Sequence, residues 1–148
     1  MVEATTARAT GTDPLSYAAR MKQARNPETV HPPLGRYVHQ IEVSGESRML
    51  FLAGQVGIEA DGNVPLDPVN QLGVALENIV RNLEAAGFET TDLVKLTTYV
   101  VGEMDPVGRR AELDRVLGTH LPTSTLVYVV ALASPDYKVE VDAWAVRS

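Results

Sequence analysis

A carboxylate, Glu140, lies in the middle of an apolar segment near the end of the chain, Lys138–Val146. Small and β-branched residues alternate there with polar or bulky ones, so Glu140, Asp142 and Trp144 share one face of a predicted strand. A carboxylate in this place is solvated, paired, or used to bind or activate a ligand. Solvation on an exposed sheet face is the commonest of these. The pattern makes Glu140 a candidate catalytic residue without deciding its role.

Cysteine is absent from the chain, and the histidines are His31, His39 and His120. The lack of cysteine excludes disulfides, thiolate nucleophiles and cysteine-based metal sites. The histidines do not have the spacing of metal ligands. We therefore expect no metal site and no cofactor, and a reducing cytoplasm is the expected compartment.

The composition and charge of the chain limit its class and its partners. With 148 residues, of which 45% are hydrophobic and 22% charged, the chain fits one globular domain with one core. Its formal net charge of -6 opposes binding to nucleic acid. A membrane span needs an apolar run of about 20 residues, and no run in the sequence approaches that length. We also find no secretory signal pattern. We expect a small-molecule ligand, and neither nucleic acid nor a membrane as a partner.

Periodicity and turn residues predict a single α/β (α+β) domain over residues 34–148, with the element order β-β-α-β-α-β-β. The predicted elements are strands at Tyr37–Val43 and Met49–Val56, a helix opened by Asp67-Pro68 and ended by Gly87, a strand at Leu93–Val101, a helix from Asp105-Pro106 to about Leu117, and strands at Thr125–Ala133 and Lys138–Val146. The first two strands are expected to form a hairpin around Ser44–Ser47. Both helices are expected on one face of a mixed sheet, and association of copies would cover the apolar strands on the other face.

Residues 1–33 are polar, rich in small residues and end in His31-Pro32-Pro33. No regular element accommodates that ending easily, so we interpret the segment as an N-terminal arm. Asp13-Pro14 can cap a short helix over Leu15–Gln23 within it, because Asp suits the cap and Pro the first turn.

Five segments, in order and with consistent spacing between about Gly35 and Val146, carry a resemblance to a known family. They are Gly35-Arg36-Tyr37, Phe51–Gln55, Gln71 and Asn78 followed by Leu83–Gly87, Leu93–Val100, and Val139-Glu140-Val141. Together they resemble the signatures of the Rid proteins, also called YjgF/YER057c/UK114. The resemblance implies a chorismate-mutase-like fold and a homotrimer with its helices outside and ligand clefts between subunits. It also implies hydrolysis of reactive enamines and imines to ketones and ammonia.

The resemblance assigns roles to residues of this chain. Tyr37 would wall the cleft, Gly54 and Gln55 would lie at the ligand, and Thr125 could donate a hydroxyl to it. Ala53 stands where relatives carry a serine. Glu140 would hold or polarise the attacking water. Each also has a structural interpretation, since tyrosine and threonine are ordinary strand residues. Gln71 and Asn78, on one side of the first helix, are expected to bridge it to neighbouring loops.

One position departs from the family pattern. Relatives commonly hold the substrate carboxylate with an arginine in a Pro-x-Arg-Ser/Thr motif, whereas this chain has Pro122-Thr123-Ser124-Thr125. A serine hydroxyl cannot replace the two charge-assisted hydrogen bonds of a guanidinium. Imines derived from amino acids should therefore bind poorly unless another cation serves. Arg36 is the first candidate, followed by Arg109 or Arg110 on the second helix.

Two functional hypotheses remain open. In the first, the protein is a divergent Rid-like enamine or imine hydrolase whose water is positioned by Glu140, acting on a small reactive metabolite. An aromatic-ring-cleavage deaminase of the aminomuconate type is a narrower variant, suggested by Gly35–His39. In the second, the protein is a trimeric metabolite-binding or regulatory protein without turnover, because Ser124 replaces the anchoring arginine. The acidic charge opposes the ribonuclease activity ascribed to some family members.

Overall fold

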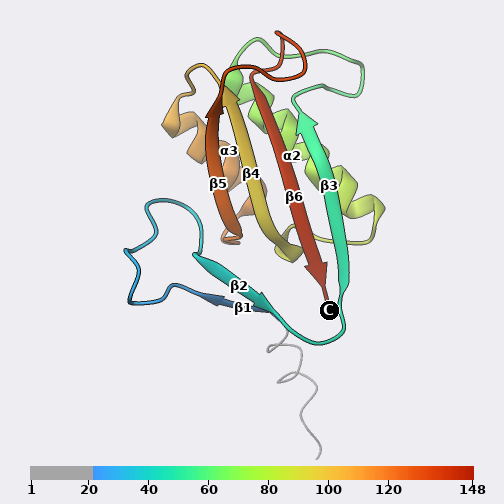
Figure 1. Ribbon diagram of the computed structural model, residues 1–148. Helices are drawn as coiled ribbons and strands as arrows, with labels where there is room; N and C mark the ends of the chain where they lie inside the picture. The colour runs from blue at the N-terminus through green and yellow to red at the C-terminus, as the bar shows by residue number, and fades with distance from the viewer. Residues whose placement is uncertain (1–21) are drawn as a thin grey trace, which may run out of the picture.

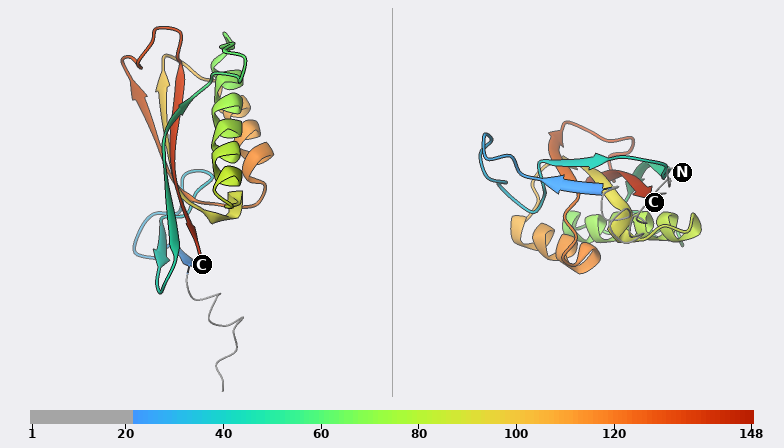
Figure 2. Two further views of the ribbon diagram at one scale, coloured as in Figure 1. Left: turned by 90° about the vertical axis from the view of Figure 1, so that its right-hand side faces the viewer. Right: turned by 90° about the horizontal axis from the view of Figure 1, so that it is seen from below.

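The computed structural model describes residues 22–148 as a four-stranded sheet with two helices on one face (Figure 1). In spatial order the strands are β3 (Arg48–Val56), β6 (Val139–Arg147), β4 (Leu93–Val101) and β5 (Thr123–Val129). The strands β4 and β5 are parallel, and the other neighbours are antiparallel, so the sheet is mixed. The helices α2 (Pro68–Ala85) and α3 (Pro106–Leu117) form one layer, which leaves the other sheet face open (Figure 2). The fold class expected from the sequence is confirmed.

The alternation predicted for the last strand decides which side chains reach the core. The small residues Val139, Val141, Ala143 and Ala145 are completely buried beneath the helices. Glu140, Asp142 and Trp144, between them in the sequence, therefore lie on the open face. The apolar stripe of α2, formed by Leu72, Leu76, Ile79 and Leu83, covers the buried side of the sheet.

Both helices begin at the predicted caps. Asp67 accepts a hydrogen bond from the backbone of Val69, and Asp105 accepts from Val107 and Gly108. A proline follows each cap, where its missing N–H costs nothing. Gly87, with φ of 73°, turns the chain after α2 ends. The short 3-10 helix η1 (Thr90–Asp92) then leads into β4.

Gln71 is buried in the first turns of α2 and ties the helix to two loops, as the sequence predicted. Its side-chain amide donates to the carbonyl oxygens of Pro65 (2.8 Å) and Asp136 (2.9 Å), and it accepts from the backbone N–H of Lys138 (2.7 Å). Asn78 donates to the carbonyl of Ile58 (2.9 Å) from the same side of the helix.

The hairpin predicted for the first two strands is wrong. The strand β2 (Gln40–Val43) pairs with β1 (Lys22–Arg25), and β3 pairs with β6 instead. The ribbon β1–β2 lies at one end of the sheet (Figure 1), where Lys22 donates to the carbonyl of Val146 (2.8 Å). Segment 37–43 is strand only from Gln40 onward. The turn at 44–47 thus links two separate sheets, a difference that turn chemistry alone does not encode.

Two further expectations about elements differ from the structure. The strand expected at Thr125–Ala133 runs from Thr123 to Val129, so its second half belongs to the loop before β6. The helix expected over Leu15–Gln23 lies outside the described residues except for its last two, which belong to β1. None of the helices in the described part of the chain is long and apolar enough to cross a membrane.

Candidate functional site

Glu140 and Gly54 meet on the open face of the sheet. A Cβ added to Gly54 would lie 1.8 Å from Oε1 of Glu140, so the carboxylate occupies the space that any other residue at position 54 would fill. The pairing of β3 with β6 shifts register between Leu52 and Gln55, which is the irregularity that contains Gly54. Glycine is therefore required here, because the Glu140 side chain approaches the backbone of β3 closely.

A second carboxylate and a phenol lie beside Glu140. The hydroxyl of Tyr99 donates to Oδ2 of Asp142 (3.2 Å), and Tyr99 is directly opposite Glu140 in the register of β4 and β6. This hydrogen bond, the negative charge of Asp142, burial and the charge of Glu140 all raise the pKa of Tyr99 above its ordinary value. The cluster Glu140–Asp142–Tyr99 keeps a protonated phenol next to two acidic groups. The sequence did not indicate Tyr99 as a site residue, because the pairing register of β4 is not visible in it.

Other predicted residues gather at the opposite edge of the sheet. Arg36, Tyr37 and Ser124 line a cavity of about 370 Å³ between α3, β5 and the loop before β2. Leu126 follows Ser124 into the same cavity, since alternate residues of a strand share a face. We call this space the α3–β5 cavity.

Arg36 is held by the end of α3. Its guanidinium donates to the carboxylate of Asp114 and to the carbonyl oxygens of Gly118 and His120, and the side chain is only 6% exposed. Burial opposes the charge of Asp114, but hydrogen bonds from Arg36 and Arg110 bring the pKa of this carboxyl below its ordinary value. Arg36 thus fixes the loop before β2 to the end of α3, and all three nitrogens of its guanidinium already donate to protein groups.

Thr125 and Gln55 lie outside both groups. The hydroxyl of Thr125 accepts a hydrogen bond from Nζ of Lys95 on the open face (2.5 Å). Gln55 donates to the carbonyl of Ala53 (3.0 Å) and accepts from Asn82 on α2 (3.3 Å), so its amide lies on the helix side. Neither side chain is directed to Glu140 by these contacts.

The predicted site residues are therefore divided between the two edges of one sheet. The Glu140–Gly54 group lies on β6 and β3, while the α3–β5 cavity is lined by Ser124 and Leu126 of β5 and by Thr98 of β4. The strands β3 and β5 are at the two edges of the sheet (Figure 1). The two groups also use opposite faces, since Glu140 is on the open face and Ser124 is on the side of α3. One copy of the chain does not bring them together.

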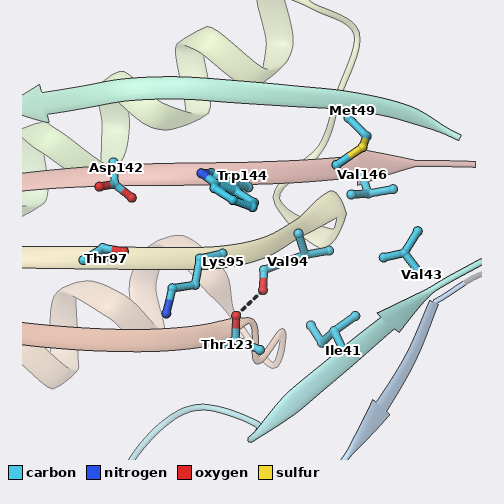
Figure 3. Close-up of a pocket in the computed structure, with 10 residues that line it drawn as sticks. All are labelled: Ile41, Val43, Met49, Val94, Lys95, Thr97, Thr123, Asp142, Trp144 and Val146. Atoms are coloured by element: carbon cyan, nitrogen blue, oxygen red, sulfur yellow. Dashed lines mark hydrogen bonds between the residues drawn. The ribbon is translucent and has the colours of Figure 1, made fainter.

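A third space lies between the β1–β2 ribbon and the open face (Figure 3). Its volume is about 510 Å³, and Ile41, Val43, Met49 and Trp144 make most of its wall apolar. Lys95 and Asp142 lie at its polar end. The groups of three or more His, Cys, Asp or Glu side chains that a metal ion needs are absent from the described residues.

Comparison with known proteins decides the family. Residues 28–147 match the family model described as endoribonuclease L-PSP. The chain belongs to the YjgF/Rid family. It is 30% identical over 124 residues to a 2-iminobutanoate/2-iminopropanoate deaminase of Escherichia coli K12, covering 81% of this chain and 94% of the relative. It is also 30% identical over 132 residues to a RutC family protein of Haemophilus influenzae, covering 86% and 98%.

Solved structures of Rid proteins share the architecture. The Rid protein YyfB of Yersinia pestis superposes with a TM-score of 0.73 at 31% identity, covering 84% of this chain and 98% of that one. The structure of E. coli TdcF with bound serine gives a TM-score of 0.63 at 27% identity, covering 86% and 100%. The resemblance carried by the five sequence segments is thus confirmed, and relatives of this chain are named as deaminases of reactive imines.

Proposed function

We propose that this Rid protein hydrolyses a small enamine or imine to a ketone and ammonia in a cleft between neighbouring copies. The observation that carries the proposal is the Glu140 carboxylate seated over Gly54, in a space that no side chain at position 54 could share. The name of the E. coli deaminase supports the reaction class. The net charge of -6 favours a small-molecule substrate over RNA, and a chain without cysteine suits the reducing cytoplasm in which we place the activity.

The chemistry assigned to Glu140 is management of a water molecule. For a protonated imine, the water oxygen bonds to the carbon of the C=N group as the π electrons pass to nitrogen, and the carboxylate accepts one proton of the water. The protonated carboxyl then gives that proton to the amino nitrogen. As the C–N bond breaks and ammonia leaves, the carboxylate accepts the hydroxyl proton while the C=O bond of the ketone forms, and it later releases that proton to solvent. Tyr99 lies directly opposite Glu140 in the sheet and donates a hydrogen bond to Asp142, and we assign to both groups a role in hydrogen bonding to substrate or water at Glu140.

The open sheet face supports assembly into the homotrimer that the family resemblance implies. Met49, Phe51 and Trp144 are 55%, 60% and 48% exposed on it, with the rings of Phe51 and Trp144 packed edge to face at 5.1 Å. Such a patch usually marks an interaction surface. Within one copy the α3–β5 cavity and Glu140 are apart. In an oligomer, the α3–β5 cavity of one copy would lie next to Glu140 of its neighbour.

Ammonia release from imines generated in situ tests the activity. Glu140→Gln should reduce the rate at least about a hundredfold. The matched control Glu84→Gln, on the exposed side of α2, should leave the rate unchanged. A wild-type protein without acceleration on any imine, or a Glu140→Gln variant as fast as wild type, would contradict the assignment.

Mixed oligomers test whether the cleft is shared. Two inactive variants are coexpressed: Glu140→Gln, and Ser124→Trp, which fills the α3–β5 cavity. A shared cleft is intact wherever one variant supplies Glu140 and its neighbour supplies Ser124, so about one quarter of the clefts in a random ring regain activity. No recovery in a confirmed mixed oligomer, or a monomer in sedimentation at micromolar concentration, would place both groups outside a common site.

A binding protein without turnover is the second candidate function. The observation that favours it is the replacement of polar ligand contacts, with Ser124 where relatives have arginine and Ala53 where they have serine. The structure of E. coli TdcF with bound serine is also a case of a relative that takes up an amino acid. Saturable binding of a small amino or oxo acid by a protein that accelerates no imine hydrolysis would decide for this function.

A further inference from the structure

The wall of the α3–β5 cavity contains basic side chains and no acidic one. Three arginines, Arg36, Arg109 and Arg110, line it, and no Asp or Glu lies among the described residues of the lining. The two arginines on α3 face the same side as Pro106 and Leu113, because helix residues three and four apart are neighbours. A small cavity with this lining attracts an anion.

Two of the three arginines already have a counter-ion. Arg36 binds Asp114, and Nε of Arg110 approaches the same carboxylate at 3.0 Å. Arg36 is further committed to two backbone carbonyls. Neither guanidinium can turn fully to a ligand without giving up these bonds, so neither is well placed as the main anion-binding group.

Arg109 is different. Its side chain is partly buried, and it makes no ion pair or side-chain hydrogen bond with any residue in the described part of the chain. The hydroxyl groups of Ser124 and Thr98, which line the same cavity, likewise have no hydrogen-bond partner among residues 22–148. A guanidinium with all its donors available and two hydroxyl groups nearby form a set of donors for one carboxylate.

We propose that Arg109 binds the anionic group of the substrate in this cavity, with Ser124 as a secondary donor. The inference rests on the proposed function and names its substrate class, which is a small carboxylate-bearing imine rather than a neutral one. The volume of about 370 Å³ and the side chains of Leu113 and Leu126 suit a short aliphatic group beside the carboxylate. In this proposal the cation is Arg109 of α3. The absence of an arginine at position 124 of β5 therefore does not remove anion recognition.

Binding of pyruvate to the full-length protein, measured by calorimetry, tests the inference without turnover. Pyruvamide has the same shape without the charge. We expect wild type to bind pyruvate at least about tenfold more tightly than pyruvamide, and Arg109→Gln to lose about ten- to hundredfold in pyruvate affinity. Arg109→Lys keeps the charge but not the paired donors and should fall between the two. The control Arg81→Gln removes an exposed arginine of α2 that is paired with Glu77 and lies outside the cavity lining, and it should lose less than about threefold.

Several outcomes overturn the inference. They are equal binding of pyruvate and pyruvamide, no binding of pyruvate by wild type, and equal losses in Arg109→Gln and Arg81→Gln. Thermal unfolding of each variant shows whether a loss of pyruvate affinity comes from misfolding. If Arg109→Gln does not fold, the pyruvate affinity of Arg109→Lys is compared with that of wild type instead. Ammonia release separates the two proposals. Pyruvate binding that depends on Arg109 in a protein that hydrolyses no imine refutes the proposed function alone, whereas hydrolysis unaffected by Arg109→Gln refutes this inference alone.

Discussion

Substituting Gly54 by alanine should inactivate the protein while leaving its fold intact. The new Cβ would lie 1.8 Å from Oε1 and 2.6 Å from Cδ of Glu140. Ordinary contact needs about 3.5 Å, so the carboxylate must move by about 1.5 Å or more. A displacement of about 1 Å in a reacting group costs on the order of a hundredfold in rate, or about 2.7 kcal/mol. We therefore expect kcat for ammonia release to fall about a hundredfold.

The free energy of unfolding should change little in the same variant. Gly54 does not have a positive φ, so alanine fits its backbone conformation. Alanine also restricts the unfolded chain, which raises the free energy of unfolding by about 0.5–1 kcal/mol. Glu140 is partly exposed, so its side chain can move away from the new Cβ. Urea unfolding should accordingly differ from wild type by less than about 1 kcal/mol.

A double-mutant cycle isolates the contact between the two residues. In a Glu140→Ala background the obstructed carboxylate is absent, so adding Gly54→Ala should reduce the remaining rate less than about threefold. Wild-type kcat in Gly54→Ala would refute the reasoning, because it would mean that displacing Glu140 does not matter. A further large loss in the double variant would also refute it, since Gly54 would then act through something other than Glu140.

Three more changes test the remaining parts of the structure. Arg36→Ala should lower the free energy of unfolding by about 2 kcal/mol in urea titration, since its guanidinium bridges three groups at the end of α3, whereas Arg110→Ala, an exposed partner, should cost less than about 0.5 kcal/mol. Gln71→Ala removes three hydrogen bonds of a buried amide and should cost about 3 kcal/mol by the same measurement, and a loss below about 1 kcal/mol would deny it that bridging role. The hydrogen bond and charge of Asp142 raise the pKa of Tyr99 above 10.0, so Asp142→Asn should lower the pKa seen in tyrosinate absorbance. The contribution of this phenol to stability is present below pH 10.0 and is lost as the pH rises through the raised pKa, and an unchanged absorbance titration would show that Asp142 has no such effect.

Local patterns predicted those features that depend on neighbours in the sequence. Alternation in β6 placed Glu140 on the open face, because the side chains of a strand alternate regardless of what the strand pairs with. The caps Asp67 and Asp105 gave the starts of both helices, since capping is completed within three residues. The family followed from short segments in a fixed order, each of which is a local feature.

Features that depend on distant pairing were not predicted. The sequence turn at 44–47 suits a hairpin, but the partner of β2 is β1, which lies in the segment interpreted as an arm. The hydrogen bond between Tyr99 and Asp142 needs the register of β4 against β6. The contacts of Arg36 are with residues 78 to 84 positions away, so no local pattern could distinguish a ligand anchor from a structural bridge.

The division of the site between two sheet edges restricts how copies can assemble. A cleft that joins the Glu140–Gly54 group of one copy to the α3–β5 cavity of the next uses two different surfaces of the same chain. Two arrangements satisfy such a contact: a two-fold dimer, in which it forms twice across the axis, and a heterologous ring of n copies, which has n equivalent clefts. The homotrimer implied by the family resemblance is the smallest ring of this kind, and it would also cover the β5 edge, whose backbone and side chains Val127 and Tyr128 are exposed in one copy.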